Sequence, residues 1–123
     1  PVFRLLKACT PGTYTFIMRA RKEVPRRLMH PKKKTVGIRV PDHNVVQAIL
    51  DELKEPFLTT TLRMPGDTDP LSDPEAIQER FLHQVDLIID SGHGGTIPTT
   101  LIDLTEAYPV ILREGKGNTE PFA

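Results

Sequence analysis

The chain has 123 residues, with 16 basic and 16 acidic side chains and 38% hydrophobic residues. This length predicts a single domain over residues 1–123, and the longest apolar runs fall far short of the ~20 residues that a membrane-spanning helix needs. A single cysteine, Cys9, excludes an intramolecular disulfide framework and a CxxC metal or redox site. Because the start has no signal-peptide layout, we expect a soluble cytoplasmic protein that does not contact a membrane.

The zero net charge hides an uneven distribution of charge along the chain. Residues 1–41 contain eleven basic side chains and one acidic side chain, a net charge of +10, whereas residues 42–123 contain five and fifteen, a net charge of −10. Such a basic segment favours an anionic partner, with phosphate as the first candidate. The alternative is that the basic third pairs with the acidic remainder, or with chain that is absent from this sequence. The order of residues does not decide between the two.

The first forty residues predict one helix and two strands. Apolar positions with helical spacing predict a helix over residues 2–8. β-Forming residues predict strands at 14–18 and 35–40. The basic segment between them, residues 19–34, contains two prolines and predicts a loop with one helical turn at 26–29.

The rest of the chain predicts further helices and strands in mixed order. Asp42 has the chemistry of an N-cap for a helix over residues 43–54. The segment Ser72-Asp73-Pro74-Glu75 fits a capping box for a helix that ends at about residue 83. Because strands and helices mix without strict alternation, we expect an α/β sheet of mixed direction. The four strands predicted from β-forming runs in this part are 57–62, 85–90, 99–104 and 109–113.

Motifs of several well-known enzyme classes are absent from the sequence. There is no P-loop, no GxGxxG after a strand, no HExxH and no GxSxG. The only serines are Ser72 and Ser91, and the four histidines lack the spacing of zinc ligands. We therefore assign no catalytic nucleophile and no metal cage, although a Mg²⁺ ion bound with a nucleotide would need no such cage.

Polar residues near predicted strand ends and turns remain as candidates for a binding site. The Pro-Gly turn at 11–15 can aim hydroxyl and amide groups at a ligand, and Arg39, followed by a helix start at His43, can hold an anion. Threonines at 59–61 and 99–100 can line one pocket if their strands are neighbours. Each feature also has a plain structural explanation, namely an ordinary turn, a helix cap and β-propensity.

Five short segments resemble a known family and occur in its order. Together they resemble the YrdC-like threonylcarbamoyl-AMP synthase family over the whole chain, and three segments are most similar to its YciO branch. The five family segments are Pro11-Gly12-Thr13-Tyr14-Thr15, Ile38-Arg39-Val40-Pro41-Asp42-His43, Val85-Asp86-Leu87-Ile88-Ile89-Asp90-Ser91-Gly92, Thr99-Thr100-Leu101-Ile102-Asp103 and Ile111-Leu112-Arg113-Glu114-Gly115. The three branch segments are Tyr14-Thr15-Phe16-Ile17, Lys22-Glu23-Val24-Pro25-Arg26-Arg27-Leu28 and Arg113-Glu114-Gly115-Lys116-Gly117.

This resemblance implies a twisted open mixed sheet with flanking helices and a large positively charged cavity. Synthases of the family combine ATP, L-threonine and bicarbonate into threonylcarbamoyl-adenylate and release pyrophosphate, with Mg²⁺ accompanying the nucleotide. Their product serves the t⁶A modification of tRNA. The resemblance also implies an alternative function, a module that binds double-stranded RNA or tRNA without synthase activity, because the family has been linked to double-stranded RNA.

The matching positions imply which residues contact the nucleotide and the other substrates. One segment departs from the family, because Thr61-Leu62-Arg63 stands where synthases have Ser-x-Asn. The family domain also continues upstream of this sequence, so we expect the C-terminal portion of a domain, inactive alone, with exposed apolar surface and a tendency to self-associate. The implied contact residues are Thr15, Arg39, His43, Thr61, Thr99, Thr100 and Arg113.

Overall fold

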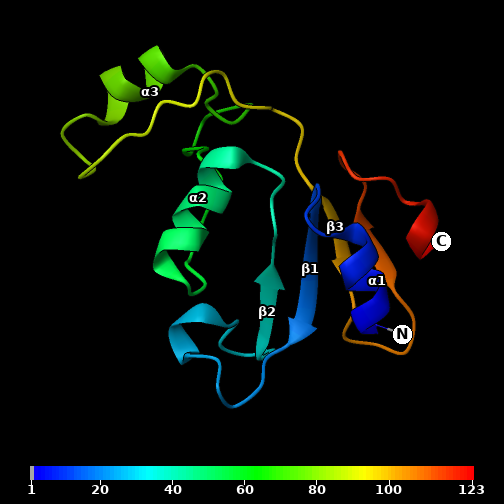
Figure 1. Ribbon diagram of the computed structural model, residues 1–123. Coiled ribbons are helices and arrows are strands. Elements are labelled where there is room, and N and C mark those ends of the chain that lie inside the picture. The colour runs from blue at the N-terminus through cyan, green and yellow to red at the C-terminus, as the bar shows by residue number, and fades with distance from the viewer. Residues whose placement is uncertain (1) are drawn as a thin grey trace. The chain divides into compact units, whose positions relative to one another are not determined.

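The computed structural model describes residues 2–123, and the chain divides into two compact units (Figure 1). Unit 1 consists of Pro1–Pro56 and Pro98–Ala123, and unit 2 consists of Phe57–Ile97. Each unit is described by itself. No helix within residues 2–123 combines the length and the apolar character that crossing a lipid bilayer requires.

Unit 1 is built on a four-stranded mixed sheet in the order β2-β1-β3-β4. β1 runs antiparallel to β2 and parallel to β3, and β3 runs antiparallel to β4. This arrangement confirms the predicted mixed α/β sheet, and each strand lies within two residues of a predicted one. The strands are β1 (Tyr14–Arg19), β2 (Thr35–Ile38), β3 (Thr100–Asp103) and β4 (Val110–Arg113).

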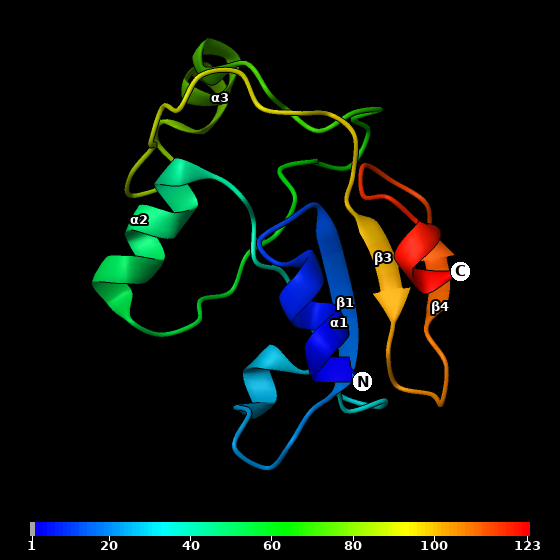
Figure 2. The same cartoon turned by 45° about the vertical axis from the view of Figure 1, so that its right-hand side comes forward.

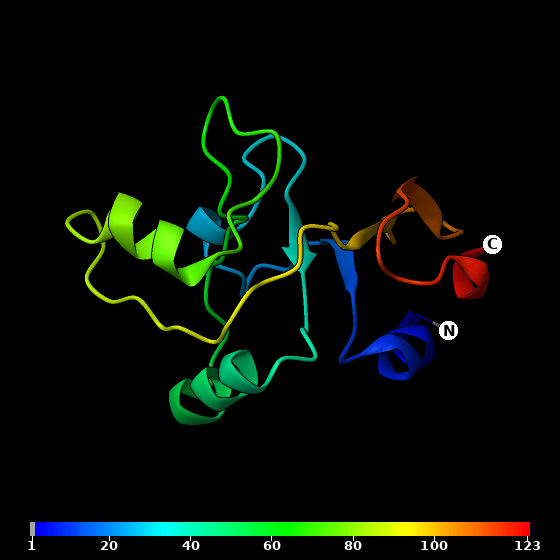
Figure 3. The same cartoon turned by 90° about the horizontal axis from the view of Figure 1, so that it is seen from above.

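The hydrophobic core of unit 1 lies on one face of this sheet. Phe16 on β1 and Ile102 on β3 are partners in register, with exposed fractions of 1% and 0%. Phe122 packs against them, with its ring centroid 5.9 Å from that of Phe16. Helix α1 (Val2–Cys9) adds two leucines to the cluster, and Phe122 itself belongs to the short 3₁₀ helix η2 (Glu120–Phe122). Figure 3 shows α1 and η2 on the same face of the sheet.

Helix α2 (Asn44–Leu53) confirms the predicted second helix, but its predicted cap is wrong. The N-cap is His43, whose Nδ1 accepts a hydrogen bond from the Val45 N–H at 3.2 Å, and Asp42 lies one residue too early. The physical reason is the backbone, because His43 is the extended residue directly before the first helical one, which is where a capping acceptor must lie. The loop between β1 and β2 contains the predicted helical turn, η1 (Arg26–Leu28).

Unit 2 contains one regular element in the described chain, helix α3 (Pro74–Phe81). The predicted capping box that begins at Ser72 is wrong, since Asp73 is the N-cap and its Oδ1 accepts from the Glu75 N–H at 3.1 Å. Pro74 follows the cap at a position where a helix has no use for a backbone N–H. The helix ends two residues before the predicted end.

The two strands predicted in unit 2, at 57–62 and 85–90, are also wrong. Neither segment forms a strand in the structure. A β-strand needs a neighbouring strand to satisfy its backbone N–H and C=O groups, and within residues 57–97 neither segment pairs with another. Their apolar side chains consequently face solvent, with Leu58 72% and Leu87 76% exposed.

Candidate functional site

Two threonine hydroxyls meet where β1 and β3 begin. Thr15 lies on β1, and Thr99 directly precedes β3, which runs parallel to β1. The two Oγ1 atoms lie 2.6 Å apart, and either hydroxyl can be the donor. Since each hydroxyl has one proton and two lone pairs, this pair keeps one O–H available to donate to a ligand whichever way the shared hydrogen bond runs.

Arg113, at the end of β4, holds Thr99 from the other side. Its Nε and Nη2 donate to the Thr99 carbonyl oxygen at 3.1 and 2.9 Å, and Nη2 also donates to Thr99 Oγ1 at 3.1 Å. Antiparallel pairing of β3 with β4 brings the arginine there. We call Arg113, Thr99 and Thr15 the hydroxyl-arginine row. It offers oxygen acceptors, an O–H donor and a guanidinium charge at one end of the sheet.

Thr100 lies next to this row but uses its hydroxyl inside the protein. The side chain is 0% exposed, and Oγ1 donates to the Gly117 carbonyl oxygen at 2.7 Å and accepts from the Gly115 N–H at 3.0 Å. A ligand contact of Thr100 therefore stays a prediction. In the structure this hydroxyl anchors residues Gly115-Lys116-Gly117, the Gly-Lys-Gly segment.

The close packing of that segment was not predicted from the sequence. A side chain at Gly115 would collide with the carbonyl oxygens of Pro98 and Thr99, and one at Gly117 would approach the Tyr14 ring to 2.5 Å. The Tyr14 hydroxyl donates to the Asn118 carbonyl oxygen at 2.8 Å, and burial raises the pKa of this phenol above its ordinary value, so it stays a donor. Two glycines two residues apart after a predicted strand were the available signal.

The other predicted contact residues make no hydrogen bond or ion pair with the row in the described chain. Arg39 follows β2 with an exposed side chain, and His43 caps α2. Thr61 belongs to unit 2 and is exposed. Their binding roles stay predictions.

At the opposite end of the β1–β3 pair, the carboxylate of Asp103 is hydrogen-bonded within the protein. The Asp103 carboxylate oxygen Oδ1 accepts from the Thr105 hydroxyl at 2.6 Å and from the Thr105 N–H at 2.8 Å. These hydrogen bonds, helped by the charges of Lys33 and Arg19, hold the pKa of Asp103 below its ordinary value. The carboxylate is thus committed to ordering the turn after β3.

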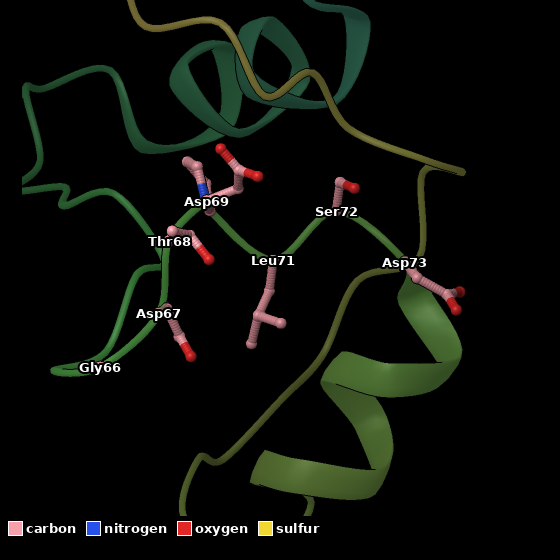
Figure 4. A pocket seen from close by; sticks show the side chains of 8 residues that line it. Gly66, Asp67, Thr68, Asp69, Leu71, Ser72 and Asp73 are labelled. Atoms are coloured by element: carbon pink, nitrogen blue, oxygen red, sulfur yellow. The ribbon is translucent and has the colours of Figure 1, made fainter.

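Unit 2 has a pocket of its own, about 390 Å³ in volume, along residues 66–73. Figure 4 shows the carboxylates of Asp67, Asp69 and Asp73 pointing away from one another. Asp67 is bound to Arg80 at 3.2 Å, and Asp73 caps α3. In the part of the chain that the structure describes, no group of three or more His, Cys, Asp or Glu side chains is arranged to hold a metal ion. This pocket is therefore a weaker candidate than the hydroxyl-arginine row.

Comparisons with known proteins identify the family. A family model described as "Telomere recombination", Sua5_yciO_yrdC, matches residues 1–115. The uncharacterized protein YciO of Escherichia coli K12 is 54% identical over 120 residues, which cover 98% of this chain and 58% of that protein. A threonylcarbamoyl-AMP synthase of Pyrococcus abyssi is 30% identical over 112 residues, 90% of this chain and 32% of that protein.

Solved structures agree with these matches. The crystal structure of E. coli YciO has a TM-score of 0.90 at 54% identity, covering 98% of this chain and 59% of that chain. P. abyssi Sua5 complexed with L-threonine has a TM-score of 0.79 at 30% identity, covering 93% and 33%. The chain spans somewhat more than half of YciO and about a third of the synthase. On these grounds the chain belongs to the Sua5/YciO/YrdC family, with YciO at the higher identity and the threonylcarbamoyl-AMP synthases as distant relatives.

Proposed function

We propose that the protein is an L-threonylcarbamoyladenylate synthase, which joins ATP, L-threonine and bicarbonate and releases pyrophosphate. The observation that carries the proposal is the hydroxyl-arginine row, a set of hydrogen-bond donors and one cation without a nucleophile. Distant homology to threonylcarbamoyl-AMP synthases supports the reaction class. The relative solved with L-threonine supports an amino acid as one substrate.

In the proposed reaction, correct positioning of the substrates matters more than covalent catalysis by the protein. A carbamate oxygen of N-carboxylated threonine attacks the α-phosphorus of ATP, a new P–O bond forms, and the bond to pyrophosphate breaks. Donors placed around the phosphate oxygens stabilise the negative charge that develops there. In our proposal the Thr15–Thr99 pair supplies an O–H donor, Arg113 orients Thr99, and Arg39 provides a bidentate fork for phosphate.

Mg²⁺ fits this proposal as a companion of the nucleotide. The row consists of hydroxyl groups and a guanidinium, which suit phosphate oxygens, whereas Mg²⁺ prefers carboxylate and phosphate oxygens. The ion would then be held chiefly by the nucleotide phosphates and would neutralise part of their charge. Its requirement is a testable part of the proposal.

The test is pyrophosphate release from ATP, with and without L-threonine and bicarbonate, measured on this chain and in parallel on E. coli YciO. Release that needs both co-substrates supports the proposal, and the tRNA t⁶A pathway is then the expected consumer of the product. Release that ignores L-threonine in both proteins overturns it. Because this chain spans 58% of YciO, activity in YciO alone would locate further essential residues in the part of YciO that these 123 residues do not match.

Variants of the row sharpen this test. Thr99→Val removes the hydroxyl that Arg113 and Thr15 share and should lower activity at least tenfold, while Thr99→Ser keeps the hydroxyl and should retain most of it. Arg39→Ala should weaken nucleotide binding about tenfold, as expected for a lost charged fork. Unchanged nucleotide affinity in Arg39→Ala would remove that residue from the proposed site.

A further inference from the structure

The loop that joins β1 to β2, residues 20–34, concentrates unpaired positive charge. We call it the basic loop; it contains seven basic side chains and one acid, Glu23, for a net charge of +6. All seven basic residues are exposed. Within residues 2–123 the carboxylates that lie close to a basic side chain are Asp67, which pairs with Arg80, and Asp73, whose Oδ1 lies 3.6 Å from His93 Nε2; all four residues belong to unit 2. No carboxylate of the described chain neutralises the basic loop by direct contact.

Hydrogen bonds join the two ends of this loop and connect residues inside it. The Ala20 N–H donates to the Lys34 carbonyl at 2.9 Å, which closes the loop where the two strands leave it. Inside, His30 Nδ1 accepts from the backbone N–H groups of Lys32 and Lys33 at 3.2 and 3.1 Å. Figure 2 shows the loop, in blue to cyan, beyond the end of β1. A surface ordered in advance loses little conformational entropy when a partner binds.

The basic loop also lines a solvent-open pocket of about 280 Å³. Apolar contacts come from Val24 and Met29, which are half-buried. An apolar cavity of roughly 150 Å³ already holds a benzene molecule, so this pocket has room for one aliphatic side chain. Four basic side chains surround it: Arg21, Lys22, Arg26 and Lys34.

We propose that the basic loop is a docking site for an acidic peptide segment of a partner protein, which inserts one aliphatic side chain between Val24 and Met29. Carboxylates on either side of that anchor pair with the surrounding arginines and lysines. An apolar pocket ringed by cations matches this partner, because burial of the anchor gives affinity and the charges give orientation and association rate. The site is separate from the hydroxyl-arginine row, so it does not depend on the proposed synthase activity.

RNA is the competing partner of a basic surface, and the loop is less suited to it. RNA-binding surfaces commonly stack bases on aromatic side chains, and residues 20–34 contain no Phe, Tyr or Trp. A phosphate backbone would also leave the apolar pocket unused. The observations therefore favour the peptide, and RNA becomes an outcome of the test.

The experiment measures binding of two fluorescent peptides by anisotropy, without nucleotide. One probe has a single leucine flanked by glutamates, and the other has serine in place of leucine. We expect the leucine probe to bind about fivefold more tightly than the serine probe. Val24→Ser should remove that difference, and Lys22→Glu or Arg26→Glu should weaken both probes about tenfold.

The control for charge is Lys116→Glu, which changes the net charge equally. Lys116 is exposed and its N–H donates to the Pro98 carbonyl, just before β3 begins, whereas the basic loop follows the end of β1. Because β1 and β3 are parallel, the two sites lie at opposite ends of the sheet. Lys116→Glu should leave the affinity of both probes unchanged, and thermal unfolding of each variant verifies that it folds.

Three results would overturn the proposal. Equal affinity for the two probes would mean that the leucine does not occupy the pocket and that the loop attracts acidic peptides by charge alone. Binding of a short RNA duplex that Arg26→Glu weakens, with no binding of either peptide, would assign the loop to RNA. Self-association of the chain that Arg26→Glu abolishes, again with no peptide binding, would assign it to a second copy.

Discussion

Units 1 and 2 both contain runs of β-forming apolar residues, but only in unit 1 do such runs form strands. Unit 1 pairs four strands and buries Phe16, Ile102 and Phe122 in one core. Unit 2 forms a single helix, buries one large apolar side chain, Phe81, and leaves Leu87 exposed. A run of β-forming residues becomes a strand when a neighbour can accept and donate its backbone hydrogen bonds. The difference between the units is therefore one of available partners more than of composition.

Truncation of a core side chain in unit 1 is the test of this contrast with the largest expected effect on stability. Phe16→Ala should lower the free energy of unfolding by about 3–5 kcal/mol, because it removes a fully buried ring. Phe57→Ala, in unit 2, is the matched variant and should cost less than about 1 kcal/mol, since Phe57 is exposed. Urea denaturation measures the free energy of unfolding of both variants. Equal decreases would contradict the contrast between a buried Phe16 and an exposed Phe57.

The second prediction concerns the buried hydroxyl of Thr100. Thr100→Val keeps the shape but leaves the Gly115 N–H and the Gly117 carbonyl without their partner, so unfolding should become easier by about 2 kcal/mol. Thr59→Val makes the same exchange at an exposed position of unit 2 and should change the midpoint little. A neutral result for Thr100→Val would mean that the Gly-Lys-Gly segment has another anchor.

A smaller effect depends on pH and tests Asp103. Its folded pKa is lowered, so the carboxylate stabilises the fold above its ordinary pKa of 3.8, and this contribution disappears as the pH falls through the folded value. Asp103→Asn should cost about 1 kcal/mol at neutral pH, and the difference from the parent should vanish in acid. Asp86→Asn, at an exposed position of unit 2, is the control. A difference that stays constant with pH would contradict this account.

The smallest effect on stability is expected in unit 2 itself. Leu87→Ser and Ile97→Ser replace exposed apolar side chains and should change the free energy of unfolding by no more than about 0.5 kcal/mol. They should nevertheless reduce self-association, since exposed apolar surface promotes it. Sedimentation velocity at two concentrations measures this. A chain that is monomeric before any substitution would refute the predicted self-association.

Much of unit 1 was predictable because its signals are local. The β-forming runs of β1 and β3 and the apolar spacing of α2 each specify an element within a few residues. The caps were missed by one position, since Asp42 and His43 can both accept a backbone hydrogen bond. Residues 57–62 and 85–90 were wrongly predicted as strands for a different reason. A strand depends on a partner strand that its own residues do not reveal.

The candidate site was predictable only in part. The Pro-Gly turn and the Thr-Thr pair pointed to Thr15 and Thr99, but their direct contact follows from the parallel pairing of β1 with β3, which no local pattern encodes. The threonines at 59–61 were expected to line the same pocket if their strands were neighbours. They belong to unit 2, and their contact with the row stays a prediction. The fork from Arg113 to Thr99 likewise depends on the register of β4.

The parallel pairing of β1 with β3 also has a consequence for how the chain folds. Thr15 and Thr99 are 84 residues apart in sequence, so their strands meet only after a long loop has closed, and such high contact order slows folding. The entropy of closure rises only slowly with loop length, by about 0.6 kcal/mol for each doubling, so insertions in the intervening segment should be tolerated. During synthesis the core cannot be completed until Phe122 has left the ribosome.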